Sequence, residues 1–319
     1  MTRYLLMGGL GNQLFQLAGA LNYTEVNSKI ELVDKIGNPR TNKSGRAEIS
    51  SFKLPEDVHL KEMKLKSVIL QMAINFGIRL SAKRQKMKLL KLIYRLASKL
   101  LAILLREKNS FACLSNGVGY DSGFKASRTG INVGYFQSYM YLLDLRTLSF
   151  MRELRINEPS DDFKVLEARA IVETPLIVHV RLGDYKNEKA FGIPSSQYYL
   201  DSLEYFEKID PNRSIWLFSN EPKDAFIMIP EKYHHRIYLV PIDSLSSAET
   251  LELMRNGTSY IIGNSSFSWW GAALSLNEDA KVISPRPWFR GSDTPNQLIP
   301  DKWLEFDAHY NIHDSEKWT

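Results

Sequence analysis

The alternation of hydrophobic and polar positions divides the chain into two halves in which short apolar strands alternate with amphipathic helices. In the first half it predicts a strand over 4–7, a Gly-rich turn, a helix over 12–26 and a second strand over 30–33. In the second half it predicts strands over 176–180, 215–218, 236–240, 260–262 and 281–283, and helices over 197–208, 248–256 and 267–276. Such alternation is typical of parallel sheets covered by helices.

A polar boundary separates the halves at 159–162, where the chain reads Pro-Ser-Asp-Asp. A length of 319 residues suits two domains. We therefore expect an α/β protein with two Rossmann-like parallel-sheet domains facing a cleft, one over 1–158 and the other over 159–319. Ligands of such sheets bind at the C-terminal ends of the strands, so the segments that follow the strands are the candidate sites.

One segment departs from this pattern. Residues 61–105 follow helical spacing, with an apolar stripe from Leu89 to Leu104, and residues 61–108 carry 13 Lys or Arg against two Glu. This basic helical insertion has a local charge of +11 in a chain of net charge +5. Two interpretations stay open: the stripe packs on the first domain and the charges are solvated, or the segment makes a peripheral contact with an anionic membrane. RNA binding is disfavoured, since only Phe76 and Tyr94 supply aromatic rings there.

Cysteine content and hydropathy indicate the cellular compartment in which the protein is expected. The single cysteine, Cys113, has no partner for an internal disulfide, which favours a reducing compartment. Neither the N-terminus nor the stretch from Leu89 to Leu105, which contains three basic residues, resembles a signal peptide or a spanning helix. We expect a cytoplasmic protein, at most peripheral on the inner face of the cell membrane.

The first polar strand end is Gly8-Gly9-Leu10-Gly11-Asn12-Gln13. Its glycines permit a tight turn and close backbone approach, and Asn12 and Gln13 present amides at a helix start. The spacing is neither a Rossmann fingerprint nor a P-loop, so an ordinary strand-to-helix turn is the equal alternative.

The second is His179-Val180-Arg181-Leu182-Gly183-Asp184-Tyr185. On a strand, His179 and Arg181 share one face, and two polar groups there are costly to bury unless they are paired. The planar fork of Arg181 suits a phosphate. The alternative is a structural ion pair between Arg181 and Asp184.

The third is Gly263-Asn264-Ser265-Ser266-Phe267-Ser268, which leads into Trp269-Trp270-Gly271. Its small polar side chains and the N–H groups of a helix start suit an anion, whereas a plain helix cap is the simpler interpretation. We expect the two Trp rings to pack in the core. A further strand end, Phe218-Ser219-Asn220, could bind a base edge.

Metal-binding patterns are missing from the sequence. It contains no Asp-x-Asp, no Cys-x-x-Cys and no ligand spacing among its six His. We expect no metal, so phosphate charge would be met by Arg181 and helix N-termini.

Taken together, these segments and Gly134-Tyr135-Phe136-Gln137-Ser138 resemble glycosyltransferase family 11, the α-1,2-fucosyltransferases of bacterial type. The resemblance implies a GT-B-like fold and an inverting, metal-independent transfer of L-fucose from GDP-β-L-fucose to the 2-hydroxyl of a galactose-type acceptor. The acceptor would be a galactose-terminated surface glycan, free or lipid-linked. Domain 159–319 would then bind GDP-fucose and domain 1–158 would lie on the acceptor side.

The resemblance also implies residue roles. Arg181 would bind the pyrophosphate and Asn220 the guanine, with Asp184 as the nearest candidate base and Asn12 holding the acceptor or the fucose. The remaining substrate-binding candidates are Gly9, Gly11, Gln13, His179, Asn264, Ser265, Ser266, Phe267 and Ser268. Family members often carry Arg-Arg where this chain has Arg181-Leu182, and we expect Leu182 to pack on the other strand face. A fucosyltransferase of another linkage and a non-catalytic nucleotide-sugar or glycan-binding protein remain alternatives.

Overall fold

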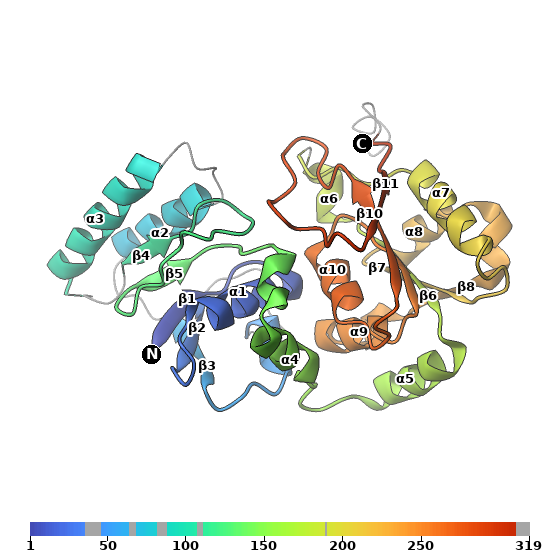
Figure 1. Cartoon of the computed structure of the whole chain (residues 1–319), viewed down its shortest axis with the longest axis horizontal. Coiled ribbons are helices and arrows are strands. Elements are labelled where there is room, and N and C mark those ends of the chain that lie inside the picture. The colour runs from blue at the N-terminus through green and yellow to red at the C-terminus, as the bar shows by residue number, and fades with distance from the viewer. Residues whose placement is uncertain (36–45, 64–67, 82–87, 107–110, 189, 311–319) are drawn as a thin grey trace. The chain divides into compact units, whose positions relative to one another are not determined.

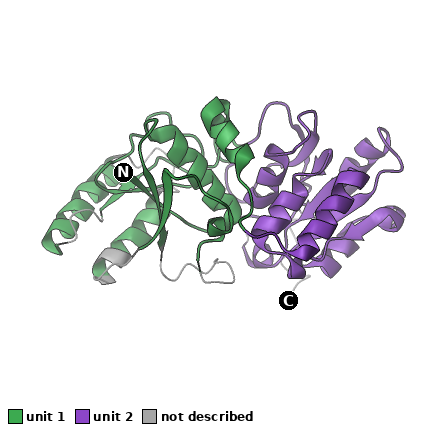
Figure 2. Cartoon of the chain, turned by 90° about the horizontal axis from the view of Figure 1, so that it is seen from below, with its two compact units in different colours: residues 1–157, 295–298 green, residues 158–294, 299–319 purple. Residues whose placement is uncertain are grey.

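The computed structural model describes residues 1–35, 46–63, 68–81, 88–106, 111–188 and 190–310. The chain forms two compact units, which Figure 2 colours separately. Unit 1 comprises Met1–Asn157 together with Pro295–Leu298, and unit 2 comprises Glu158–Thr294 together with Ile299–Thr319. The sequence did not predict that residues 295–298 belong to unit 1.

Unit 1 contains a five-stranded parallel sheet (Figure 1). The strand order is β3-β2-β1-β5-β4. Their bounds are β1 Thr2–Leu5, β2 Ile30–Lys35, β3 Val58–Met63, β4 Ala112–Leu114 and β5 Ile131–Val133. The sheet therefore starts at its centre with β1 and grows to one side, and the direction of growth reverses between β1 and β5.

Helices cover both faces of this sheet. They are α1 Leu10–Tyr23, η1 Glu48–Ser51, α2 Val68–Ser81, α3 Lys88–Leu104, η3 Tyr139–Leu143 and α4 Leu145–Glu153. Leu5 of β1 belongs to a core cluster with Ile74 of α2 and Tyr94 of α3. The neighbouring Tyr4 points the opposite way, because successive strand residues alternate, and its hydroxyl lies 3.1 Å from Thr24 Oγ1 at the end of α1. α2 and α3 therefore cover one face and α1 the other.

The prediction of helix from Lys61 onward was wrong at its start, because Val58–Met63 forms β3. Val58 is buried while His59 and Lys61 are exposed, which is the alternation of a strand. Lys61 also forms a cross-strand ion pair of 3.3 Å with Glu31. Strands β4 and β5 were not predicted, since three residues each are too few for a periodic signal.

Unit 2 contains a six-stranded parallel sheet of order β11-β10-β9-β6-β7-β8. Its strands are β6 Leu176–Val180, β7 Ile215–Ser219, β8 Ile237–Leu239, β9 Ser259–Ile261, β10 Lys281–Arg286 and β11 Leu304–Asp307. Numbered within the unit this order is 3-2-1-4-5-6, that of the Rossmann fold. The expected α/β class with two Rossmann-like parallel-sheet domains, as in a GT-B-like chain, is confirmed.

The helices of unit 2 pack on both sheet faces. They are α5 Asp161–Glu173, α6 Asp184–Asn187, α7 Ser196–Glu207, α8 Pro222–Met228, η4 Glu231–Arg236, η5 Ile242–Ser244, α9 Ser247–Met254 and α10 Ser266–Ala273. Val178 and Val180 of β6 form one core with Tyr199 and Leu203 of α7. On the other face, the indole of Trp216 in β7 donates to Glu173 of α5 at 2.7 Å.

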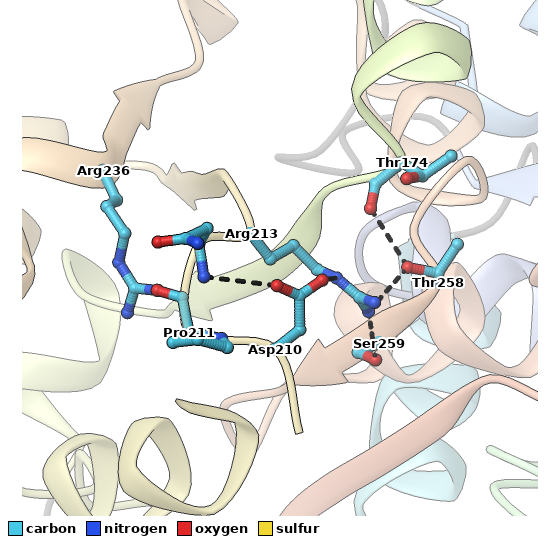
Figure 3. A network of polar contacts seen from close by, with 8 residues as sticks. Thr174, Asp210, Pro211, Arg213, Arg236, Thr258 and Ser259 are labelled. Atoms are coloured by element: carbon cyan, nitrogen blue, oxygen red, sulfur yellow. Dashed lines mark hydrogen bonds and ion pairs between the residues drawn. The ribbon is translucent and has the colours of Figure 1, made fainter. Parts of the chain in front are cut away.

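A polar network closes the N-terminal edge of this sheet (Figure 3). Arg213, just before β7, donates to Asp210 at 3.0 Å and to the hydroxyls of Thr258 and Ser259 at 3.0 and 3.1 Å. Thr258 in turn donates to the carbonyl of Thr174 at 3.1 Å. Because these residues precede or begin β6, β7 and β9, the network fixes the strand starts and leaves the opposite edge for ligands.

Candidate active site

Three of the predicted polar segments meet at the C-terminal edge of the unit 2 sheet. β6 pairs with β7 on one side and with β9 on the other, all parallel. The segments that follow these strands contain Arg181, Asn220 and Asn264. The strand order reverses between β6 and β9, and sheets of this class bind ligands at that switch point.

Arg181 follows β6 and lies against two side chains of the next turn. Its Nη2 is 2.6 Å from Asp184 Oδ1, and its Cζ lies 5.5 Å from the centroid of the Tyr185 ring. The Arg181–Asp184 ion pair considered as an alternative is therefore present. A guanidinium has five N–H donors, so this pairing leaves it able to bind a second acceptor.

His179 is buried beside Arg181. Its side chain is 4% exposed, and its Nδ1 has no hydrogen-bond partner among the described residues. Burial, and to a lesser extent the positive charge of Arg181, lower the pKa of His179 to about 3. The imidazole is therefore neutral at physiological pH. The backbone of Gly263 passes so close that a Cβ there would lie 3.1 Å from the His179 carbonyl oxygen.

Asn220 fixes the turn after β6. Its Oδ1 accepts from the backbone N–H of Leu182 at 2.9 Å. Gly183 adopts φ +65°, and a Cβ at this position would lie 2.4 Å from Asn220 Nδ2, so the turn requires glycine. A ligand bound here would thus meet an amide whose oxygen already accepts one hydrogen bond. Leu182 is fully buried in the core with Val180, as expected.

The third segment forms the start of α10. Ser265 caps this helix, since its Oγ accepts from the N–H of Phe267 at 3.3 Å. The Ser268 hydroxyl donates back to the Ser265 carbonyl at 3.2 Å and is fully buried. The partly exposed residues are Ser266 and Phe267. A first helical turn has no intrahelical acceptors for its N–H groups, so Ser266 and Ser268 can offer theirs to an anion.

Asn264 joins this segment to the Arg181 turn. Its Nδ2 donates to the carbonyls of Phe191 and Gly192, each at 3.0 Å. Its own carbonyl accepts from the Tyr185 hydroxyl at 3.2 Å. Asn264 is 1% exposed, and its Oδ1 has no partner among the described residues.

The Gly-rich segment lies in unit 1, where most of its polar groups are engaged by the backbone. Gln13 is fully buried, donates to the Gly8 carbonyl at 2.9 Å and accepts from Ile49 N–H at 2.9 Å. The N–H of Leu10, at the first turn of α1, donates to Glu48 at 2.5 Å. The start of α1 therefore already holds a carboxylate; Gly9 is the N-cap residue of this helix and Gly11 is its second residue.

Asn12 is the partly exposed polar group of that segment. Its Oδ1 accepts from Gln137 Nε2 at 2.8 Å, which joins the Gly-rich turn to the Gly134–Ser138 motif. These two residues follow β1 and β5, the strands between which the unit 1 sheet reverses direction.

Three residues that contribute to these segments were not predicted as site residues. Tyr185 and Gln137 stand in motifs that were quoted, and their signal was a polar side chain directly after a strand. Glu48 gave no signal, because residues 35–58 show no periodic pattern. Both Trp269 and Trp270 are fully buried, so their predicted packing role is confirmed.

Neither a metal cluster nor a spanning helix is found within the described ranges. No group of three His, Cys, Asp or Glu side chains there could hold a metal ion. None of the helices described is long and apolar enough to cross a membrane.

Comparison with known proteins gives the family. The chain is 28% identical over 317 residues to an α-1,2-colitosyltransferase of Escherichia coli, covering 95% of this chain and 97% of that protein. It is 23% identical over 182 residues to a galactoside 2-α-L-fucosyltransferase of Caenorhabditis elegans, covering 54% and 48%. The fucosyltransferase NodZ from Bradyrhizobium aligns with a TM-score of 0.45 at 11% identity, covering 85% of this chain and 93% of NodZ. The family model for glycosyl transferase family 11 matches residues 2–289, and the chain belongs to that family.

Proposed function

We propose that this glycosyltransferase moves L-fucose, with inversion, from GDP-β-L-fucose to the 2-hydroxyl of a galactose-type acceptor in surface glycan synthesis. The observation that supports a nucleotide-sugar donor most directly is the meeting of Arg181 and the start of α10 at the switch point between β6 and β9. The names of the α-1,2-colitosyltransferase and the galactoside 2-α-L-fucosyltransferase support the linkage and the acceptor class.

In this proposal, Arg181 and the α10 start bind the pyrophosphate. Negative charge grows on the leaving phosphate as the glycosidic bond breaks, and preorganised donors at that point stabilise the transition state. Arg181 supplies a full positive charge, and the N–H groups of Ser266 and Ser268 supply the helix dipole. His179, neutral and with an unpartnered Nδ1, is suited to a neutral hydrogen bond to the donor.

We propose a positioning role for Asp184. Its Oδ1 lies 2.6 Å from Arg181 Nη2, so the carboxylate can hold the guanidinium in the orientation in which it would bind the pyrophosphate. Asp184→Asn should therefore lower kcat without moving the pKa values of the pH–rate profile, whereas loss of a general base would remove the acidic limb of that profile.

Asn12 would hold the acceptor or the fucose. Its partner Gln137 donates to its Oδ1 at 2.8 Å and so fixes the orientation of the Asn12 amide. Asn12 would therefore offer its amide to a ligand in one side-chain conformation.

The donor sugar is the main question, because colitose is L-fucose without its 3-hydroxyl. A site that hydrogen-bonds a hydroxyl rejects the sugar lacking it by about 10⁴–10⁵ in kcat/KM, whereas an apolar subsite discriminates far less. The experiment is to offer GDP-fucose and its 3-deoxy analogue with a panel of β-galactosides and to determine the product linkage by NMR. A preference for the 3-deoxy donor would make this chain a colitosyltransferase, and absence of both transfer and donor hydrolysis would support a binding protein.

We further propose that no metal takes part. The described pyrophosphate-facing groups are a guanidinium and helix N–H groups, which can balance the charge without a cation. Transfer should keep its full rate in excess EDTA. A large loss that Mg²⁺ or Mn²⁺ restores would contradict this proposal.

A further inference from the structure

The helix α3 packs on unit 1 through a narrow face of mixed polarity. The residues directed to the sheet are Lys91, Tyr94, Ser98 and Ala102, all buried and spaced three or four apart. Lys91 Nζ donates to the Ser115 carbonyl at 2.9 Å, and the Tyr94 hydroxyl donates to the Ala73 carbonyl of α2 at 2.6 Å. The amphipathic helix is therefore oriented opposite to the usual arrangement for a water-soluble domain.

The apolar stripe consequently faces away from the core. Its seven side chains are 46–71% exposed and recur at helical spacing: Leu89, Leu92, Ile93, Leu96, Leu100, Ile103 and Leu104. The adjoining helix α2 adds Ile69, Met72 and Phe76, also at least 55% exposed. The two helices touch where Phe76 lies 6.0 Å from the Tyr94 ring. The interpretation that the stripe packs on the first domain is therefore wrong within the described residues.

The charges beside this apolar surface are all positive. Arg95 and Lys99, both exposed and one turn apart, lie along one edge of the α3 stripe, and exposed Arg79 follows Phe76 on α2. Neither helix contains an acidic residue. A protein partner would need only apolar complementarity, whereas an anionic bilayer matches both features, since it takes apolar side chains at the acyl boundary and basic ones at the headgroups.

We propose that the outer face of α2 and α3 docks unit 1 on an anionic lipid bilayer, with α3 lying in the plane of the interface. The seven stripe residues would enter the acyl boundary, and Arg95, Lys99 and Arg79 would contact headgroup phosphates. α3 has 17 residues, a length of about 25 Å, so the stripe can insert along its whole face without spanning. The inference is independent of the donor and acceptor proposed above.

Co-sedimentation of the full chain with vesicles tests the proposal. Binding to vesicles containing phosphatidylglycerol should exceed binding to pure phosphatidylcholine and should fall steeply with added salt. Leu92→Ser, Leu96→Ser and Leu100→Ser together should weaken binding about 100-fold or more. Arg95→Gln with Lys99→Gln should weaken it about 25-fold, since each basic side chain contributes roughly a factor of five.

A matched control comes from α5, whose apolar residues Val165, Ile171 and Val172 are 60–83% exposed. Changing these three to Ser should leave vesicle binding unaltered. All variants should keep their thermal unfolding and their transfer to a short soluble acceptor, because no substituted residue belongs to the candidate active site.

Three outcomes would overturn the proposal. The wild-type chain could stay in the supernatant with anionic vesicles at low salt. The α3 triple variant could bind as tightly as wild type. Sedimentation velocity without lipid could show a dimer that the triple variant abolishes, together with no lipid binding, which would assign this face to a second copy of the chain.

Discussion

At the candidate active site, Arg181 is the residue proposed to contribute most to binding the negative charge of the donor. Arg181 directly follows β6 at the switch point. Its ion pair with Asp184 and its contact with the Tyr185 ring hold the guanidinium in place. A geometry set by neighbours before the donor arrives costs no reorganisation during the reaction.

We predict that Arg181→Ala lowers kcat/KM for transfer by about 10²–10³, the usual cost of removing one preorganised donor from a developing negative charge. Arg181→Lys should recover little, since an ammonium cannot reproduce two parallel hydrogen bonds and also keep the Asp184 contact. Steady-state kinetics measure both, with thermal unfolding as the check on folding. Retention of half the wild-type kcat/KM by Arg181→Ala would remove this residue from the mechanism.

His179 makes stability depend on pH. Its folded pKa of about 3 lies below the ordinary value of 6.5, so below pH 6.5 the unfolded chain binds a proton that the folded chain does not. This contribution to stability is complete above pH 6.5 and is lost as pH falls toward 3. Between pH 7 and pH 5 the loss amounts to about 2 kcal/mol.

Denaturant unfolding at pH 7, 6 and 5 measures this slope. His179→Gln lacks the titrating group, so its free energy of unfolding should fall by about 2 kcal/mol less than that of wild type over the same interval. The slopes are compared rather than the absolute values, since the substitution itself changes packing. Parallel curves for the two proteins would show that His179 is not buried in neutral form.

At the scale of elements, the sequence pattern predicted five of the six strands of unit 2, but it missed β11 and the helices α5 and α8. β6 was predicted at its observed bounds, and α7 within one residue, because buried parallel strands are continuous apolar runs and the helices between them are amphipathic. β4 and β5 depend on their pairing with each other and with β1, which no local pattern contains.

The orientation of α3 shows another limit of sequence reasoning. Its periodicity predicted the helix and the stripe, but the stripe faces outward, because the buried contacts of Lys91 and Tyr94 fix the opposite face on the sheet. A hydrophobic pattern identifies an apolar face without saying what covers it. Likewise, Gln13 and Asn12 are neighbours in one motif. The Gln13 amide forms its hydrogen bonds with backbone groups, whereas the Asn12 amide oxygen accepts from the side chain of Gln137.

The start of α10 has a structural role and a proposed binding role. Comparing its N-cap residue with the N-cap residue of another helix can separate the two. Ser265 caps α10 and Ser160 caps α5, each through its Oγ. Replacing either by Ala should lower the free energy of unfolding by about 1 kcal/mol, the usual loss of a cap. Only Ser265→Ala should also raise KM for the donor, because the freed N–H of Phe267 alters the anion site.

Chemical denaturation and donor titration of both variants test this. Equal KM values for the two variants and wild type would reduce Ser265 to a cap.

At the scale of the whole molecule, the chain crosses between the units three times. After Asn157 it enters unit 2, and at Pro295–Leu298 it returns to unit 1 before finishing in unit 2. This short return is held by the backbone: Tyr120 N–H donates to the Asn296 carbonyl at 3.3 Å and Tyr139 N–H to the Gln297 carbonyl at 2.9 Å. Unit 1 is therefore incomplete without residues from the far end of the sequence.

Gly119 is where this return lies closest to the rest of unit 1. A Cβ on Gly119 would lie 2.5 Å from both the backbone N and O of Asn296, whereas a Cβ on Gly123 would meet only Asp121 Oδ1, at 3.6 Å. Gly119→Ala should displace the 295–298 segment and lower stability by about 1–3 kcal/mol, as overpacking does. Gly123→Ala should be neutral or slightly stabilising, because it restricts the unfolded chain without a clash.

Amide hydrogen exchange measures the displacement of the 295–298 segment. The amides of Tyr120 and Tyr139 donate to the returning segment, so their protection should fall in Gly119→Ala and stay at the wild-type level in Gly123→Ala. Amides in β6, which belongs to unit 2, serve as the internal reference for global unfolding. If both tyrosine amides keep wild-type protection in Gly119→Ala, the segment tolerates a side chain there and the two hydrogen bonds do not depend on the close approach at Gly119.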